Sequence, residues 1–148
     1  MSIFGGLGRS SILDRKFSQE EAISAILLSI IASDGEISDE EVDAFISVAN
    51  NHPTMRNQSA SDFKRMVDEQ QSVLRKQGWE KLFDKGATEL PQALAQTVFV
   101  LAVDFVLSDG SVDAAEERLI GKLRDALSIA DDLVGAAVEV LSIKYAVK

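Results

Sequence analysis

Hydrophobic residues recur every three or four positions along most of this chain, the spacing that places them on one face of an α-helix. The segment from 39 to 49 shows the pattern most plainly, with Val42, Phe45, Ile46 and Ala49 on one stripe. Two other segments, around residues 22–31 and 93–107, are apolar on nearly every side, so we expect them to be central helices. No stretch alternates with a period of two. The pattern therefore predicts an all-α protein without a sheet.

Capping residues predict where the helices begin. A Ser or Asp followed three residues later by Glu forms a capping box, in which each residue satisfies a free backbone N–H of the other. Three such pairs occur: Ser18 with Glu21, Ser38 with Glu41, and Asp113 with Glu116. We expect helix ends at Gly35, Gly78, Gly86 and Gly110, and Thr88 as the cap of the second apolar helix. The expected helices, about seven in all, span residues 19–34, 38–49, 59–77, 79–85, 88–107, 114–127 and 131–142.

A short acidic motif occurs twice, at residues 33–38 and 108–113, with its Asp-Gly pairs 75 positions apart. Each copy joins an apolar helix to an amphipathic one, and we call these two segments, continued through the first turn of the following helix, the acidic joints. The repeat predicts two pseudo-symmetric helix-loop-helix halves packed in one orthogonal, bundle-like domain. That domain is expected over residues 17–148, after a flexible N-terminal arm at 1–16.

Charge and cysteine content narrow the function classes. The chain carries 24 acidic and 15 basic residues, for a net charge of −9, and so lacks the basic footprint that nucleic acid requires. There is no cysteine, which excludes disulfides and thiolate chemistry and fits a cytoplasmic protein. The apolar segment at 93–107 is shorter than the roughly 20 residues that span a bilayer. We therefore expect no transmembrane segment and no signal peptide.

The acidic joints are the candidate site, because carboxylate oxygens are the ligands that Ca²⁺ and Mg²⁺ prefer. Capping alone also explains Glu41, Asp113 and Glu116, and acids in a first helical turn oppose the helix dipole. Neither joint is an EF-hand, since Phe45 and Ile120 stand where a bidentate glutamate is required. The candidate ligands are Asp34, Glu36, Asp39, Glu40, Glu41, Asp109, Asp113, Glu116 and Glu117.

Asp104 is a further candidate, because it lies inside the most apolar helix of the chain, where an unpaired charge is costly. It requires a partner, which is either a basic side chain or helix N-terminus, or a bound ion or ligand. The corresponding position in the first half is Ser29, so this feature is not duplicated.

The two joints, with Ala32-Ser33-Asp34-Gly35-Glu36-Ile37-Ser38-Asp39-Glu40-Glu41 in one and the segment from Ala102 to Asp113 in the other, resemble the tellurite-resistance TerB family. The likeness covers about residues 17–145. It implies a seven-helix stress-response protein of two similar halves, with a divalent-metal-linked role and no established enzymatic activity. TerB-like domains also accompany J domains in membrane-tethered co-chaperones, but His52-Pro53-Thr54 lacks the aspartate of the J-domain tripeptide.

The residue pattern and the family resemblance together favour a binding module, and neither indicates a particular reaction. Its acidic joints are expected to take a divalent cation or a basic protein partner within a stress-response complex, whose partners include membrane-associated proteins as one option. The alternatives are a metal-assisted hydrolase, which needs both joints to converge on a concave pocket, and a purely structural homodimer.

Overall fold

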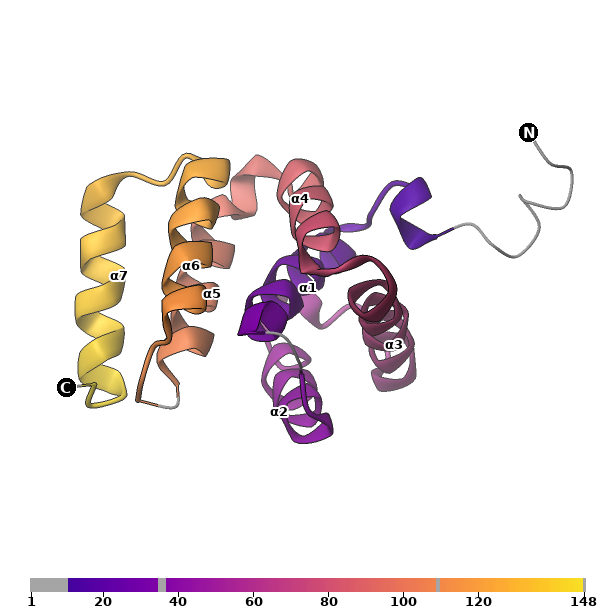
Figure 1. The fold of residues 1–148 in the computed structure, drawn as a ribbon, viewed down its shortest axis with the longest axis horizontal. Coiled ribbons are helices and arrows are strands. Elements are labelled where there is room, and N and C mark those ends of the chain that lie inside the picture. The colour runs from indigo at the N-terminus through magenta and orange to yellow at the C-terminus, as the bar shows by residue number, and fades with distance from the viewer. Residues whose placement is uncertain (1–10, 35–36, 109, 148) are drawn as a thin grey trace, which may run out of the picture.

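The computed structural model describes residues 11–34, 37–108 and 110–147, with Asp34 described by its backbone alone. Over these residues the chain forms seven α-helices, four short 3₁₀ helices and no strand (Figure 1). The predicted all-α class is therefore confirmed. The helices are α1 (Gln19–Ile31), α2 (Asp39–Ala49), α3 (Ala60–Gln77), α4 (Trp79–Glu89), α5 (Ala95–Leu107), α6 (Ala114–Leu127) and α7 (Asp131–Lys144). The twofold relation between the halves stays a prediction.

The apolar helix α1 is the centre of the core. Its residues from Ala22 to Ile30 are all buried, and it packs against α3, α4, α5 and α6. Figure 1 shows α1 in the middle of the molecule, with α5, α6 and α7 on one side and α3 on the other. A helix that is apolar all round can be stabilised only by partners on every side, which is the arrangement observed.

Gly86 does not end α4, as the sequence suggested, but lies inside that helix. A methyl group at this position would lie 3.0 Å from the Ala22 carbonyl oxygen, 3.0 Å from Ile26 Cγ1 and 3.1 Å from Ala25 Cβ. The glycine therefore permits the close contact of α4 with α1. Close helix packing, and not chain termination, explains this residue.

The prediction that Thr88 caps the second apolar helix is also wrong. Thr88 belongs to α4, and α5 begins only at Ala95, after Pro91 and a 3₁₀ turn over Gln92–Leu94. The N-cap residue Leu94 provides no side-chain hydrogen bond. Because Pro disfavours helical geometry in the residue before it, Pro91 separates α4 from α5.

No single described helix is long and apolar enough to cross a membrane. Helix α4 and the segment 92–107 reach that length and apolarity only as a pair, and this pair is bent by 108°.

The other helix ends follow the local signals closely. Both halves of the predicted capping boxes are formed at α1, α2 and α6. Gly78 ends α3 with a φ of +88°, a conformation that favours glycine. The α-helix α1 ends at Ile31, and Ala32–Asp34 form a 3₁₀ turn, whereas the predicted stop at Gly35 lies outside the described residues.

Helices α2 and α3 pack through aromatic and buried polar contacts. The Phe45 ring of α2 lies 6.0 Å from Phe63 of α3 and 5.6 Å from Phe105 of α5, measured between centroids. In α3, the fully buried Gln70 accepts a 2.7 Å hydrogen bond from Ser24 and donates one of 2.9 Å to the Glu21 carbonyl oxygen. The aromatic contacts position α2, and with it the first acidic joint, against the core, while the hydrogen bonds of Gln70 join α3 to α1.

The segment before α1 contacts the domain. Arg15 pairs with Glu21 at 2.6 Å, and Phe17 is buried beneath the Lys85 ammonium group, which lies 5.0 Å from the ring centroid. Burial raises the pKa of Glu21, but hydrogen bonds from Arg15 and Ser18 outweigh it, so that this pKa is lowered overall. The side chains that precede Ser18 thereby fix the start of α1.

Candidate binding groove at the acidic joints

Residues of both acidic joints line one groove of about 480 Å³ between α2, α5, α6 and the end of α7. In Figure 1 the end of α5, the start of α6 and the end of α7 lie together at the lower edge of the molecule. We call this cavity the joint groove. Its lining residues are Ile31, Glu41, Ala44, Phe45, Val48, Leu101, Asp104, Phe105, Ser108, Asp113, Glu116, Lys144 and Tyr145.

The capping boxes place three of the groove's carboxylates. Glu41 accepts a hydrogen bond from the Ser38 N–H at 3.1 Å, and Glu116 accepts one from the Asp113 N–H at 3.2 Å. Asp113 in turn accepts one from the Glu116 N–H at 2.7 Å. Each carboxylate is thus held by backbone donors at a helix N-terminus while it lines the groove. Capping and ligand binding are compatible roles for these residues, since a carboxylate can accept several hydrogen bonds.

Asp104 is the fourth groove carboxylate, and two residues at the end of α7 contact it. Lys144 Nζ lies 3.3 Å from Asp104 Oδ2, and the Tyr145 hydroxyl donates a hydrogen bond to Oδ1. The hydrogen bond to Asp104 raises the pKa of Tyr145 above the usual 10.0 and burial adds to this, with Lys144 as a smaller opposing influence. The expected basic partner of Asp104 is therefore Lys144, joined by a phenol.

Apolar side chains form the rest of the groove. Phe45, Leu101 and Phe105 lie at its wall, and Val48 is 57% exposed beside them. The Lys144 ammonium group also lies 4.8 Å from the centroid of the Tyr145 ring. The groove thus combines an acidic rim with an apolar surface, a combination suited to a side chain or segment that carries both a cation and apolar atoms.

Three other predicted ligands, Asp39, Glu40 and Glu117, are exposed in the first turns of α2 and α6 and are not among the groove's lining residues. The backbone of Asp34 lies in a 3₁₀ turn, while Glu36 and Asp109 fall outside the described residues. Among the residues that the structure describes, no three His, Asp or Glu side chains form a group that could hold a metal ion.

Lys144 and Tyr145 line the groove but were not among the predicted site residues. They lie 40 and 41 positions from Asp104, and their contact depends on α7 packing against α5. One signal was available in the sequence, because Tyr145 is the only tyrosine of the chain and directly follows a lysine. A buried phenol usually requires a hydrogen-bond partner, which Asp104 supplies.

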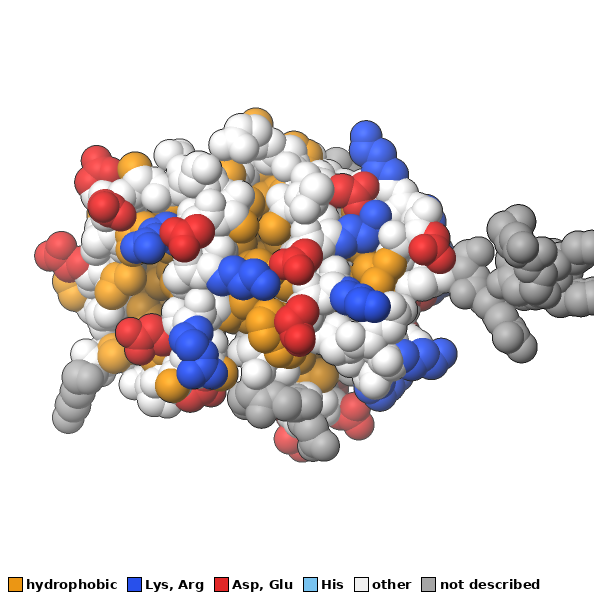
Figure 2. Space-filling model, turned by 45° about the horizontal axis from the view of Figure 1, so that its top comes forward, with side chains coloured by type: hydrophobic (Ala, Val, Ile, Leu, Met, Phe, Trp, Pro, Cys, Tyr) orange, Lys and Arg blue, Asp and Glu red, His pale blue; other side chains and the backbone are white. Residues whose placement is uncertain are grey.

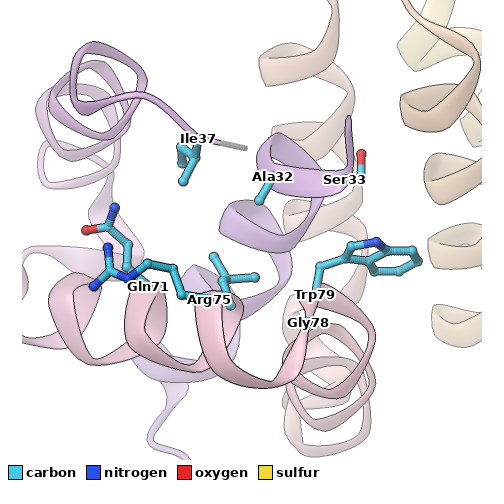
Figure 3. A pocket seen from close by; sticks show the side chains of 8 residues that line it. Ala32, Ser33, Ile37, Gln71, Arg75, Gly78 and Trp79 are labelled. Atoms are coloured by element: carbon cyan, nitrogen blue, oxygen red, sulfur yellow. The ribbon is translucent and has the colours of Figure 1, made fainter. Parts of the chain in front are cut away.

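A second cavity, of about 440 Å³, lies beside the first joint (Figure 3). Ala32, Ile37 and Leu74 give it an apolar surface, and the polar ends of Gln71 and Arg75 lie together at one side. Trp79 lines it from the start of α4, but in Figure 3 its ring points to the side away from Gln71 and Arg75. Of the two joints, only the first contributes described residues to this cavity. Its other lining residues are Ala32 and residues between 71 and 79.

Acidic and basic side chains are interspersed on the face shown in Figure 2, with apolar side chains between them. The net charge of −9 therefore does not produce a uniformly acidic field over that face.

Residues 20–137 match the model of a protein family described as Tellurite resistance protein TerB. This range includes both acidic joints and all of α2 to α6. No curated protein and no solved structure gives a significant match.

Proposed function

Because the chain belongs to the tellurite-resistance TerB family, we propose that it is a binding module of a stress-response or tellurite-resistance system whose joint groove takes a basic side chain of a protein partner. The observation that carries this proposal is the convergence of Glu41, Asp113 and Glu116 from both joints on one groove, together with Asp104. Among the described residues that line the groove, four are acidic and one, Lys144, is basic. A further ammonium or guanidinium group is therefore electrostatically complementary to it.

The apolar wall of the joint groove favours a partner's side chain over a bare ion as the ligand. Lysine and arginine carry a long apolar stem below the charge, and that stem packs on exposed apolar surface such as Val48. A small inorganic cation gains nothing from such a wall, because its affinity comes from oxygen ligands alone.

A divalent cation is the second candidate ligand. Each joint concentrates acids over a few positions, and residues of both joints line the same groove. The cation would be held by these carboxylates, and the predicted ligands Asp34, Glu36 and Asp109 stay predictions because their side chains lie outside the described part of the chain. The same convergence meets the requirement set for a metal-assisted hydrolase, which we rank lower because the described residues offer no three-ligand group.

Charge-neutralising variants that preserve the caps test the proposal. Glu41→Gln, Asp113→Asn and Glu116→Gln remove three groove charges, while Gln at N3 and Asn at the N-cap still cap a helix. The matched control is Asp39→Asn, Glu40→Gln and Glu117→Gln, which removes three charges from the same joints outside the groove lining. The probe is an end-blocked peptide, Ala-Ala-Lys-Ala-Ala, titrated into the labelled full-length chain and followed by NMR.

We expect the groove triple variant to bind the lysine peptide about tenfold more weakly than the unaltered chain. The control variant should retain most of the affinity, with a loss that disappears at higher salt because it acts only through the general field. Equal losses in both variants, or no binding by the unaltered chain, would contradict the proposal. Parallel calorimetry with Ca²⁺, Mg²⁺ and Mn²⁺ tests the second candidate, which requires ion binding that the groove variant weakens.

A further inference from the structure

We infer that the joint groove is built for a lysine or arginine followed by an aromatic residue in a protein partner, and that the chain's own Lys144–Tyr145 pair occupies this position until the partner displaces it. The inference rests on the proposed function and specifies both the chemistry of the partner and an internal competitor. It starts from the fact that the groove already holds a cation and an aromatic ring from its own chain.

Lys144 and Tyr145 both contact Asp104, in the last turn of α5. One of its oxygens accepts the hydrogen bond from the Tyr145 hydroxyl, and the other faces Lys144 Nζ at 3.3 Å. The Lys144 ammonium group also lies over the Tyr145 ring, at 4.8 Å from its centroid. An ammonium group, an aromatic ring and a carboxylate are thus arranged as one recognition unit.

The internal pair matches one of the groove's carboxylates, that of Asp104. Glu41 and Asp113 also line the groove, and no ion pair joins either of them to a basic side chain among the described residues. Val48 also stays 57% exposed at the apolar wall. A partner segment with a basic and an aromatic side chain can therefore make more charge and apolar contacts in the groove than the end of α7 does.

The end of α7 has few buried side chains, as expected of a segment that a partner displaces. Only Ala137 and Leu141 of this helix are buried, whereas Val140 is 62% and Ile143 is 74% exposed. The Lys144 side chain is 55% exposed in its ion pair, and such pairs contribute little to stability. Release of Lys144 and Tyr145 leaves both buried side chains of α7, Ala137 and Leu141, in the core.

Single substitutions of Lys144 in the full-length chain test the inference. Lys144→Gln removes the internal cation from an exposed position and leaves Tyr145 and the core in place. Lys64→Gln is the matched control, because Lys64 is an exposed lysine of α3 that does not line the groove. The probes are three end-blocked peptides, Ala-Ala-Lys-Tyr-Ala, Ala-Ala-Lys-Ala-Ala and Ala-Ala-Glu-Tyr-Ala, with binding followed by NMR.

We expect Lys144→Gln to bind the Lys-Tyr peptide about five- to tenfold more tightly than the unaltered chain or Lys64→Gln, because the competent groove is more populated. The Lys-Ala peptide should bind more weakly than the Lys-Tyr peptide, and the Glu-Tyr peptide should not bind. The amide signals of Val48, Leu101 and Phe105 should shift during the titration.

Two results would overturn the inference. If Lys144→Gln binds the Lys-Tyr peptide no more tightly than the control, the pair is not a competitor. If Lys-Ala binds as tightly as Lys-Tyr, the groove does not select an aromatic neighbour. In either case, lysine-peptide binding that is lost in the groove triple variant keeps the proposed function, whereas absence of binding by every lysine peptide contradicts both.

Discussion

The Tyr145 hydroxyl donates a hydrogen bond to the Asp104 carboxylate and so joins the end of α7 to the last turn of α5, across 41 positions of sequence. Together with the Lys144–Asp104 ion pair, this bond fixes the end of a helix that contributes only Ala137 and Leu141 to the buried core. The contact also places a basic side chain, that of Lys144, in the candidate groove. The same two residues therefore connect local stability to the proposed binding site.

The first prediction concerns the ionisation of Tyr145. Its pKa is expected above 10.0, because the phenol must keep its proton to donate to Asp104. Since this pKa is higher in the folded than in the unfolded state, the stabilisation is complete below the unfolded pKa and is lost as pH rises through the folded pKa. Tyr145 is the only tyrosine, so phenolate absorbance during an alkaline titration reports this group alone. Asp104→Asn should move the pKa back toward the usual value, and an unchanged titration would contradict the assigned cause.

The second prediction is that Tyr145→Phe destabilises the fold modestly. The ring and its contact with Lys144 are kept, and only the hydrogen bond to the carboxylate is lost. Such bonds are worth about 1.5–3 kcal/mol when buried, and the partial exposure of this site should reduce the loss to about 1 kcal/mol. Urea denaturation measures the change in the free energy of unfolding. An equal loss in the Asp104→Asn background would show that the effect has another origin.

The third prediction compares two helical glycines. Gly86→Ala is expected to cost about 1–3 kcal/mol, because the added methyl group meets the Ala22 carbonyl oxygen and Ile26 at 3.0 Å. Gly121→Ala, in α6, meets no atom within 4 Å and should stabilise the protein by about 0.5–1 kcal/mol through helix propensity. Thermal and urea unfolding of both variants check the difference. Stabilisation by both substitutions would refute the close-packing role of Gly86.

The fourth prediction concerns the buried polar pair of Ser24 and Gln70. Gln70→Leu removes the acceptor of the Ser24 hydroxyl and the donor to the Glu21 carbonyl oxygen, and should cost about 1–3 kcal/mol. Adding Ser24→Ala should restore part of that loss, since an unpartnered hydroxyl is then removed as well. A double-mutant cycle in urea measures the coupling. Strictly additive losses would argue against a linked pair.

Much of the fold could be predicted because its signals are local. A capping box involves residues three positions apart, so Ser38 with Glu41 and Asp113 with Glu116 marked the starts of α2 and α6 before any packing was known. The predictions failed where a local signal had a tertiary meaning. Gly86 resembled a helix stop but serves the contact of α4 with α1, and Thr88 was taken as a cap although Pro91 separates the two helices.

The candidate site divides in the same way. Residue chemistry and short spacings are sufficient to predict the all-α class, the two acidic joints and the need of Asp104 for a partner. Tertiary packing is what places Glu41, Asp113 and Glu116 along one groove and leaves Asp39, Glu40 and Glu117 outside its lining. Tertiary packing likewise brings Lys144 and Tyr145 to Asp104 as its partners. Helix packing brings together residues far apart in the chain, such as Glu41 with Asp113 and Tyr145, and no local spacing specifies which of them meet.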